Sequence, residues 1–248
     1  MEHHPSLLAI WLTKLLGLSQ HSWPHFAPGA QFSVLERYDH LLVSLLAALL
    51  VLAFSMAVKK RLALVPGPLQ QAAEALVGIV IGEAKAKIGH GFERYVPLIG
   101  TLGLFILVNN LLGLIPGLGT GNANWNVPLA MAIGVFLFYN FMGMKTQGFT
   151  HYWAHFGGPM PWYTFIWVLL FPLEVTGLFI RIFSHSMRLF MNLALEHLIS
   201  GVFFMIFPLF VPVPLMFLGL LVCCIQAYVF IVLTSLYIGG AVVAAEHH

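Results

Sequence analysis

The sequence EVTGLFIRIFSHSMRLFMNLALEH, residues 174–197, places charged and polar groups at helical spacing within a long apolar stretch. On a projection of 100° per residue, these groups fall within an arc of about 120°. They are Glu174, Arg181, Ser184, His185, Arg188, Asn192 and Glu196. Most of the other residues are Leu, Ile, Phe, Met and Val, so the stretch predicts a membrane helix with one polar face.

Charged residues are costly in such a helix, because each ionisable side chain inside a bilayer costs roughly 2.5 kcal/mol or more. The polar face therefore has to meet water, protein or its own neighbours instead of lipid. An aqueous ion path is one function that fits. The alternative is a set of buried salt bridges, such as Glu174 with Arg181, that only pack helices together. A buried ion pair adds little stability, which favours the ion path.

The whole chain has the composition of an all-α membrane protein. Of its 248 residues, 60% are hydrophobic and 8% are charged, whereas a soluble domain carries about 25% charged residues. A net charge of +2 gives no reason to expect a nucleic-acid partner. The only cysteines, Cys223 and Cys224, are adjacent and predict neither a disulfide framework nor a zinc site. No phosphate-binding loop is present, so we expect no cofactor and no ATP binding by this chain.

The apolar runs divide the chain into an N-terminal arm, residues 1–37, and a single membrane domain, residues 38–248. Five crossings are predicted, at about 40–58, 97–115, 128–144, 165–207 and 214–245. Residues 68–88 alternate apolar and polar sides at helical spacing, which predicts an amphipathic helix along the membrane surface. The last two apolar stretches are too long for perpendicular spans, because about 40 helical residues extend about 60 Å. These helices must tilt, lie nearly flat or break, and Pro172 is a candidate break or start point.

The distribution of Lys and Arg predicts the orientation of the chain. With the N-terminus outside, seven of the 11 basic residues lie inside, two lie outside, and Arg181 and Arg188 lie within the membrane. The inner residues are Lys59, Lys60, Arg61, Lys85, Lys87, Arg94 and Lys145, and the outer ones are Lys14 and Arg37. The C-terminus is therefore expected in the cytoplasm.

Two motifs near the end of the chain resemble subunit a of F-type rotary ATP synthases. The first is Arg-Leu-Phe-Met-Asn at 188–192, followed by Glu196 and His197. The second is Gln-Ala-Tyr-Val-Phe at 226–230, followed by Leu233 and Thr234. The segment 110–116, Asn-Leu-Leu-Gly-Leu-Ile-Pro, and the tail 244–248 also look like that family. The likeness extends from about residue 38 to the end.

The resemblance implies a proton-translocating subunit of the membrane sector, forming two offset half-channels beside a rotor ring of small hairpin c subunits. The last two helices would form a long, tilted hairpin against this ring. Peripheral-stalk b subunits and, indirectly, the soluble ATPase sector are the other implied partners, besides the lipid bilayer. On its own the chain would not be an enzyme. A bacterial plasma (inner) membrane is the expected location.

Arg188 matches the essential arginine of the family. Its guanidinium stays charged at working pH, so it can attract an ionised ring carboxylate without relaying the proton. By resemblance, Asn192 and Gln226 line the path near it. The other polar positions of the long helix are Ser184, Glu174 and Arg181. The candidates for an outer proton relay are Glu196, His197 and His185, because Glu and His can exchange protons near neutral pH.

The chain departs from the family pattern at a few positions. Met191 stands where family members commonly have Gly, and the common acid nine positions after the arginine is replaced by His197. Glu196 lies one position earlier, while Gly219 replaces a titratable residue often found in the last helix. We hypothesise that these changes compensate one another, with a larger acid on one helix opposite a missing side chain on the other.

Several other interpretations remain open. Gly219, Gln226 and Tyr237 share one face, where a lone Gln could simply form a helix–helix hydrogen bond. A stand-alone secondary transporter could use Arg188 and Glu196 for an anionic substrate, although no inverted repeat is visible. An intramembrane enzyme would need a nucleophile–base pair that the sequence does not supply. A metal site at residues 151 and 155, both His, lacks a third ligand.

Overall fold

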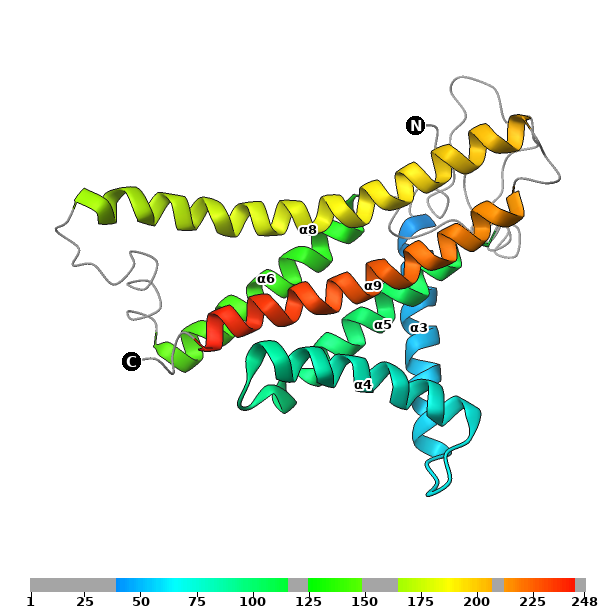
Figure 1. Cartoon of the computed structure of the whole chain (residues 1–248), viewed down its shortest axis with the longest axis horizontal. Coiled ribbons are helices and arrows are strands. Elements are labelled where there is room, and N and C mark those ends of the chain that lie inside the picture. The colour runs from blue at the N-terminus through cyan, green and yellow to red at the C-terminus, as the bar shows by residue number, and fades with distance from the viewer. Residues whose placement is uncertain (1–38, 116–124, 149–164, 207–211, 244–248) are drawn as a thin grey trace, which may run out of the picture.

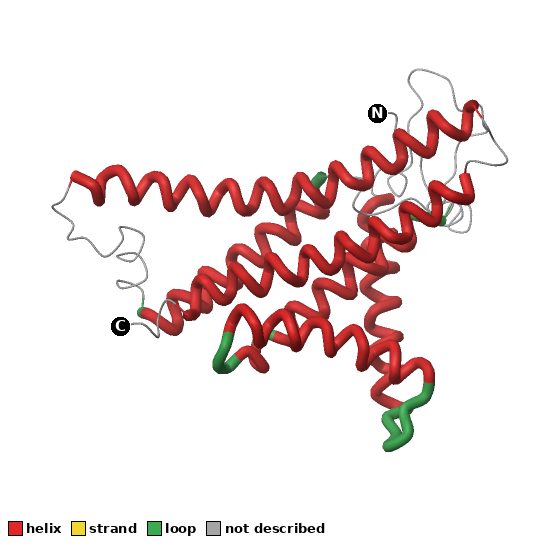
Figure 2. Tube along the Cα trace, viewed as in Figure 1, coloured by secondary structure: helices red, strands yellow, loops and turns green. Residues whose placement is uncertain are grey.

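The computed structural model describes residues 39–115, 125–148, 165–206 and 212–243 (Figure 1). Within these ranges all regular secondary structure is helical (Figure 2), which confirms the predicted all-α class. The N-terminal arm 1–37 lies outside the described residues, as do the loops 116–124 and 149–164.

The first half of the chain forms three long helices. α3, Asp39–Lys60, ends at Lys59 and Lys60, two of the basic residues predicted to lie inside. α4, Pro68–Ile88, begins with a proline in its first turn, where the missing N–H costs nothing. Gly89 follows it with φ 74°, a left-handed value that favours glycine. The short 3-10 helix η1, Phe92–Arg94, leads into α5, Val96–Gly113.

The second half contributes α6, Asn126–Gln147, α8, Phe165–Ile206, and α9, Pro212–Val243. α8 has 42 residues and α9 has 32, so at 1.5 Å per residue they extend about 63 and 48 Å. α8 continues through Pro172, so the helix does not break at that candidate position. Figure 1 shows α8 and α9 approaching each other at their joined ends and spreading apart toward the start of α8.

Four helices of the described residues are long and apolar enough to cross a membrane: His40–Lys60, Val96–Gly113, Asn126–Lys145 and Pro214–Val242. They correspond to four of the five predicted crossings. The fifth, 165–207, lies in α8, and its passage through the membrane stays a prediction. The outer surface suits lipid, because Leu45, Leu49 and Leu52 of α3 are each more than half exposed.

α9 lies at the centre of the bundle, where it contacts α4, α5, α6 and α8. The hydrophobic core is built mainly around it, and Ile99, Ile106 and Ile238 are fully buried there. α8 packs chiefly on α6 and less extensively on α9. Of the polar residues of α8, Arg181 and His185 lie between α6 and α9.

One side of α4 is buried against this bundle through Val80, Ala84 and Ile88, which recur every four residues. Val77 and Ile81 lie on the same apolar side, at three-residue spacing from Val80 and Ala84, but are exposed. The helical spacing of these apolar residues agrees with the predicted amphipathic pattern, while the position of α4 along a membrane surface remains a prediction.

α4 and α9 meet at two kinds of contact. A Cβ placed on Gly239 would overlap the backbone carbonyl of Lys87, so the two backbones approach as closely as glycine allows. At the surface, the Tyr228 hydroxyl donates a hydrogen bond to Glu83 Oε1 over 2.7 Å. Glu83 also pairs with Lys87 one turn later. The hydrogen bond from Lys87, and then that from Tyr228, hold the pKa of the Glu83 carboxyl below its usual value.

Candidate functional site

The two sequence motifs meet at a hydrogen bond between α8 and α9. Asn192 Nδ2 donates to Gln226 Oε1 over 2.6 Å. Gln226 is buried, and Asn192 is partly buried one helical turn beyond Arg188. The structure therefore brings together Asn192 and Gln226, which the sequence placed on separate helices, and Gln226 does form a helix–helix hydrogen bond.

Arg188 itself is partly exposed, whereas its neighbour Leu189 is fully buried. Among the side chains that the structure describes, no carboxylate lies within ion-pair distance of Arg188. The guanidinium carries a permanent positive charge, and the side chain is partly exposed.

The side of α8 toward its N-terminus carries a second polar group of residues. His185, only 5% exposed, stacks against Phe230 with ring centroids 4.2 Å apart. Tyr237 lies 6.1 Å from the same imidazole, measured between ring centroids. Arg181 places its guanidinium carbon 5.6 Å from the centroid of the Tyr237 ring, within cation–π range. His185, Arg181 and Tyr237 thus form a cluster one turn from Arg188, on the opposite side from Asn192.

The polar arc of α8 does not share one environment. Ser184 is exposed, while His185 and Ser186 next to it are buried. Ser186 accepts a hydrogen bond from Trp125 Nε1 over 3.2 Å and donates to the carbonyl of Phe183 over 3.1 Å. The edge of the arc at Ser184 therefore faces outward, while Ser186, which lies outside the arc, is held by Trp125 just before α6.

Three predicted site residues cannot be placed in this geometry. The side chains of Glu174, Glu196 and His197 lie outside the described residues, although their backbones belong to α8. The suggested Glu174–Arg181 salt bridge and the outer relay accordingly stay predictions, as does compensation between Glu196 and Gly219. His151 and His155 also lie outside the described ranges. In the part that is described, no cluster of metal-ligating side chains occurs.

Sequence reasoning missed several residues that line this region. Phe230 and Thr234 lie on the α9 face that carries Gln226 and Tyr237, at spacings of four, four and three residues. This spacing was a usable signal, because residues three or four apart share a helix face. Tyr139 of α6, whose ring lies 6.0 Å from that of Tyr237, had no comparable signal.

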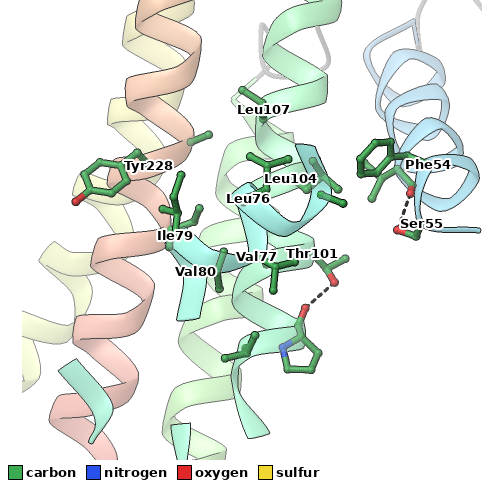
Figure 3. A pocket seen from close by; sticks show the side chains of 18 of the residues that line it. Phe54, Ser55, Leu76, Val77, Ile79, Val80, Thr101, Leu104, Leu107 and Tyr228 are labelled. Atoms are coloured by element: carbon green, nitrogen blue, oxygen red, sulfur yellow. Dashed lines mark hydrogen bonds between the residues drawn. The ribbon is translucent and has the colours of Figure 1, made fainter. Parts of the chain in front are cut away.

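A large groove lies elsewhere, between α3, α4, α5 and α9 (Figure 3). It has a volume of about 560 Å³ and a mostly apolar wall. The hydroxyls of Ser55 and Thr101 in this wall donate to carbonyls of their own helices. Tyr228 directs its hydroxyl away from the other labelled side chains, toward Glu83. This groove offers no chain of free polar groups, so it is not the candidate ion path.

Comparison with known proteins connects this geometry to a family. Residues 41–239 match the family model described as ATP synthase A chain. The chain is similar to ATP synthase subunit a 1 of Syntrophotalea carbinolica, with 37% identity over 247 residues, covering 98% of this chain and 99% of the relative. It is also similar to ATP synthase subunit a of Helicobacter pylori strain Shi470, with 36% identity over 208 residues, covering 82% of this chain and 89% of the relative.

Proposed function

Since this chain belongs to the ATP synthase A chain family, we propose that it forms two offset half-channels for protons beside a ring of small hairpin subunits, with Arg188 separating them. Membership in this family makes the chain a multi-pass membrane component of ATP synthase, with a role in the proton-translocating sector. The stand-alone transporter and the intramembrane enzyme therefore lose their support. The half-channels, the ring and the role of each residue are the parts we propose.

The observation that carries the proposal is the Asn192–Gln226 hydrogen bond next to a partly exposed Arg188, which has no ion-pair partner among the described side chains. A polar pair between two apolar helices provides groups that can hydrogen-bond to water on one side of the arginine. The arginine supplies a fixed positive charge that favours ionisation of an approaching carboxylate. It cannot pass the proton on, so it prevents a direct leak between the two half-channels.

The face of α8 that we assign to the ring also carries Arg188. Ser184, Met191 and Leu195 lie on this face and are exposed. Val202 extends it by two further turns and is half exposed. A continuous exposed stripe of this length fits a partner helix that slides past Arg188, and the stripe would be covered in the assembled complex.

We assign the outer half-channel to Glu196 and His197, which would deliver protons to the level of Asn192 and Gln226. Ser184, Arg181 and Glu174 would line the inner half-channel. His185 was grouped with the outer relay from the sequence, but its contacts with Tyr237 and Phe230 favour the inner side. A transmembrane voltage would drive each charge with about 2.3 kcal/mol per 100 mV.

The proposal also covers the topology of the chain, its partners and its membrane. The N-terminal arm 1–37 would lie outside and the C-terminus in the cytoplasm, with residues 38–248 forming one membrane domain. The partners would be the c-ring, the peripheral-stalk b subunits and, through them, the soluble ATPase sector. The membrane would be a bacterial inner membrane, in keeping with bacterial relatives at 36–37% identity.

The test is ATP-driven acidification of inverted membrane vesicles that carry the assembled complex. Arg188→Gln is expected to abolish pumping while ATPase subunits stay bound to the membrane. Met191→Leu changes an exposed apolar neighbour on the same face, and it should pump at nearly the wild-type rate. If Arg188→Gln vesicles acidify normally, Arg188 does not separate the half-channels and the proposal is wrong.

A further inference from the structure

A small cavity lies between α6, α8 and α9, beside the cluster of His185, Arg181 and Tyr237. Its volume is about 10 Å³, close to the minimum that one water molecule requires. Its lining consists of Ala132, Val135, Phe136, Tyr139, Arg181, Ile182, His185 and Tyr237. Most of the wall is apolar, and four of these residues, Tyr139, Arg181, His185 and Tyr237, bring polar groups to it.

Two buried polar atoms belong to side chains of this lining. His185 Nε2 and Tyr139 Oη have no hydrogen-bond partner within 3.5 Å among the residues described, and their side chains are only 5% and 2% exposed. The Arg181 side chain also lies near the Tyr139 hydroxyl. Burying a polar atom without a full hydrogen bond is unfavourable. Two such atoms in the lining of one cavity indicate a site for a single ligand that can both donate and accept a hydrogen bond.

We propose that this cavity binds one water molecule between His185 Nε2 and Tyr139 Oη, and that His185 carries protons through it along the inner half-channel. The inference rests on the proposed proton path and identifies a relay within it. An unprotonated ring nitrogen accepts a proton from the side of Arg188 and gives an imidazolium. The other nitrogen then releases its proton, which restores neutral histidine. The bound water receives one proton and passes one on, so it keeps its composition.

The charged and titratable groups that face His185 come from three helices. On its own helix these are Arg181 and Arg188, which carry a permanent positive charge. From α6 it meets Tyr139, and from α9 it meets Tyr237. The two tyrosine hydroxyls can donate and accept hydrogen bonds. His185 is the group among them whose ring has two nitrogens, so one can accept a proton while the other releases one.

The path can continue along α9 beyond the cavity. Thr234 is fully buried, and its hydroxyl also lacks a hydrogen-bond partner in the described part of the chain. It lies four residues after Phe230 and three before Tyr237, on the face that meets His185. A second hydroxyl is therefore present on the same side, while Phe230 closes the way toward Gln226.

The experiment compares His185→Gln and Tyr139→Phe with wild type in inverted vesicles containing the whole complex, from pH 5.5 to 8.5. We expect His185→Gln to lower ATP-driven pumping about tenfold throughout this pH range, because glutamine cannot relay a proton. Tyr139→Phe should lower pumping less. Tyr95→Phe, at a buried tyrosine that does not line the cavity, should leave it unchanged.

Chemical rescue separates relay from packing. His185→Ala leaves space for a small heterocycle, so added imidazole should restore pumping, whereas pyrazole, equal in size but far less basic, should not. Equal rescue by both would overturn the relay, as would wild-type pumping with an unchanged pH profile in His185→Gln. In either case loss of pumping in Arg188→Gln would still support the half-channels. Normal pumping in Arg188→Gln would instead remove the proposed function itself.

Discussion

Asn192 and Gln226 face each other across the interface of α8 and α9, with Asn192 Nδ2 2.6 Å from Gln226 Oε1. The bond lies one turn from Arg188, and so it fixes the spacing of the two helices at that level. We predict that Asn192→Leu and Gln226→Leu each reduce proton pumping. The double variant should lose about threefold less than the product of the two single losses, because hydrogen bonds between membrane helices contribute about 0.6 kcal/mol on average. Pumping rates of the four proteins measure this coupling, and fully multiplicative losses would contradict it.

Phe230 separates the Asn192–Gln226 pair from the cluster around His185, and its side chain is only 2% exposed. We predict that Phe230→Asn opens a passive proton leak, because it replaces an apolar barrier with a group that can hold water. The measurement is the decay of a pH gradient in vesicles whose ATPase sector has been removed. Phe230→Leu keeps the barrier apolar, so the pH gradient should decay no faster than in wild type. An unchanged decay in Phe230→Asn would show that the barrier lies elsewhere.

Gly239 allows α9 to touch the backbone of α4, since a Cβ there would overlap the carbonyl of Lys87. We predict that Gly239→Ala destabilises the subunit by about 1–3 kcal/mol, the usual cost of overpacking. Gly240 is the matched control, because it is exposed and a Cβ at this position would meet nothing within 4 Å. Thermal denaturation of the purified complex should show a lower midpoint for Gly239→Ala only. Equal midpoints would mean that α4 can move away from α9 at little cost.

The Glu83 carboxylate accepts hydrogen bonds from Lys87 and Tyr228, and together they keep its pKa below the usual value. A lowered pKa in the folded state means that the charged form stabilises the fold. This contribution is fully present above the unfolded-state pKa near 4.5 and is lost as pH falls through the lower folded-state value. We predict that Glu83→Gln lowers the denaturation midpoint at pH 7, by less than Gly239→Ala does. The difference from wild type should shrink as the pH falls below 4.5.

Tyr228→Phe tests the same contact from α9. It should reproduce part of the pH 7 effect, since it removes only the second of the two hydrogen bonds to Glu83. An unchanged midpoint in both variants would show that this exposed contact adds nothing to the attachment of α4.

Much of the fold could be predicted because lipid imposes simple rules on a chain. Apolar length set the positions of α3, α5, α6 and α9, and the observed helices begin and end within three residues of the predicted crossings. The amphipathic pattern identified α4. Whether the helix breaks at Pro172 was harder to predict, because a proline near the start of a long helix removes one hydrogen bond without forcing a break.

The site was only partly accessible from sequence. Arg188, Asn192 and Gln226 could be found because polar residues in an apolar helix are conspicuous and matched a family motif. The difference between exposed Ser184 and buried His185 could not be predicted from sequence, since it depends on which neighbour covers each side of α8. Tyr139 comes from a third helix, and only packing reveals that it lines the same cavity as His185.

The central place of α9 has a mechanical consequence. If a rotating ring drags on α8, the load passes by contact to α6 and α9, and from α9 through Gly239 and Tyr228 into α4. Densely packed interiors have low compressibility, so such a bundle would bend little under torque. Elastic energy from each rotary step would then be stored in thinner parts of the complex. The distance between α8 and α9 near Arg188 would stay constant while the ring turns.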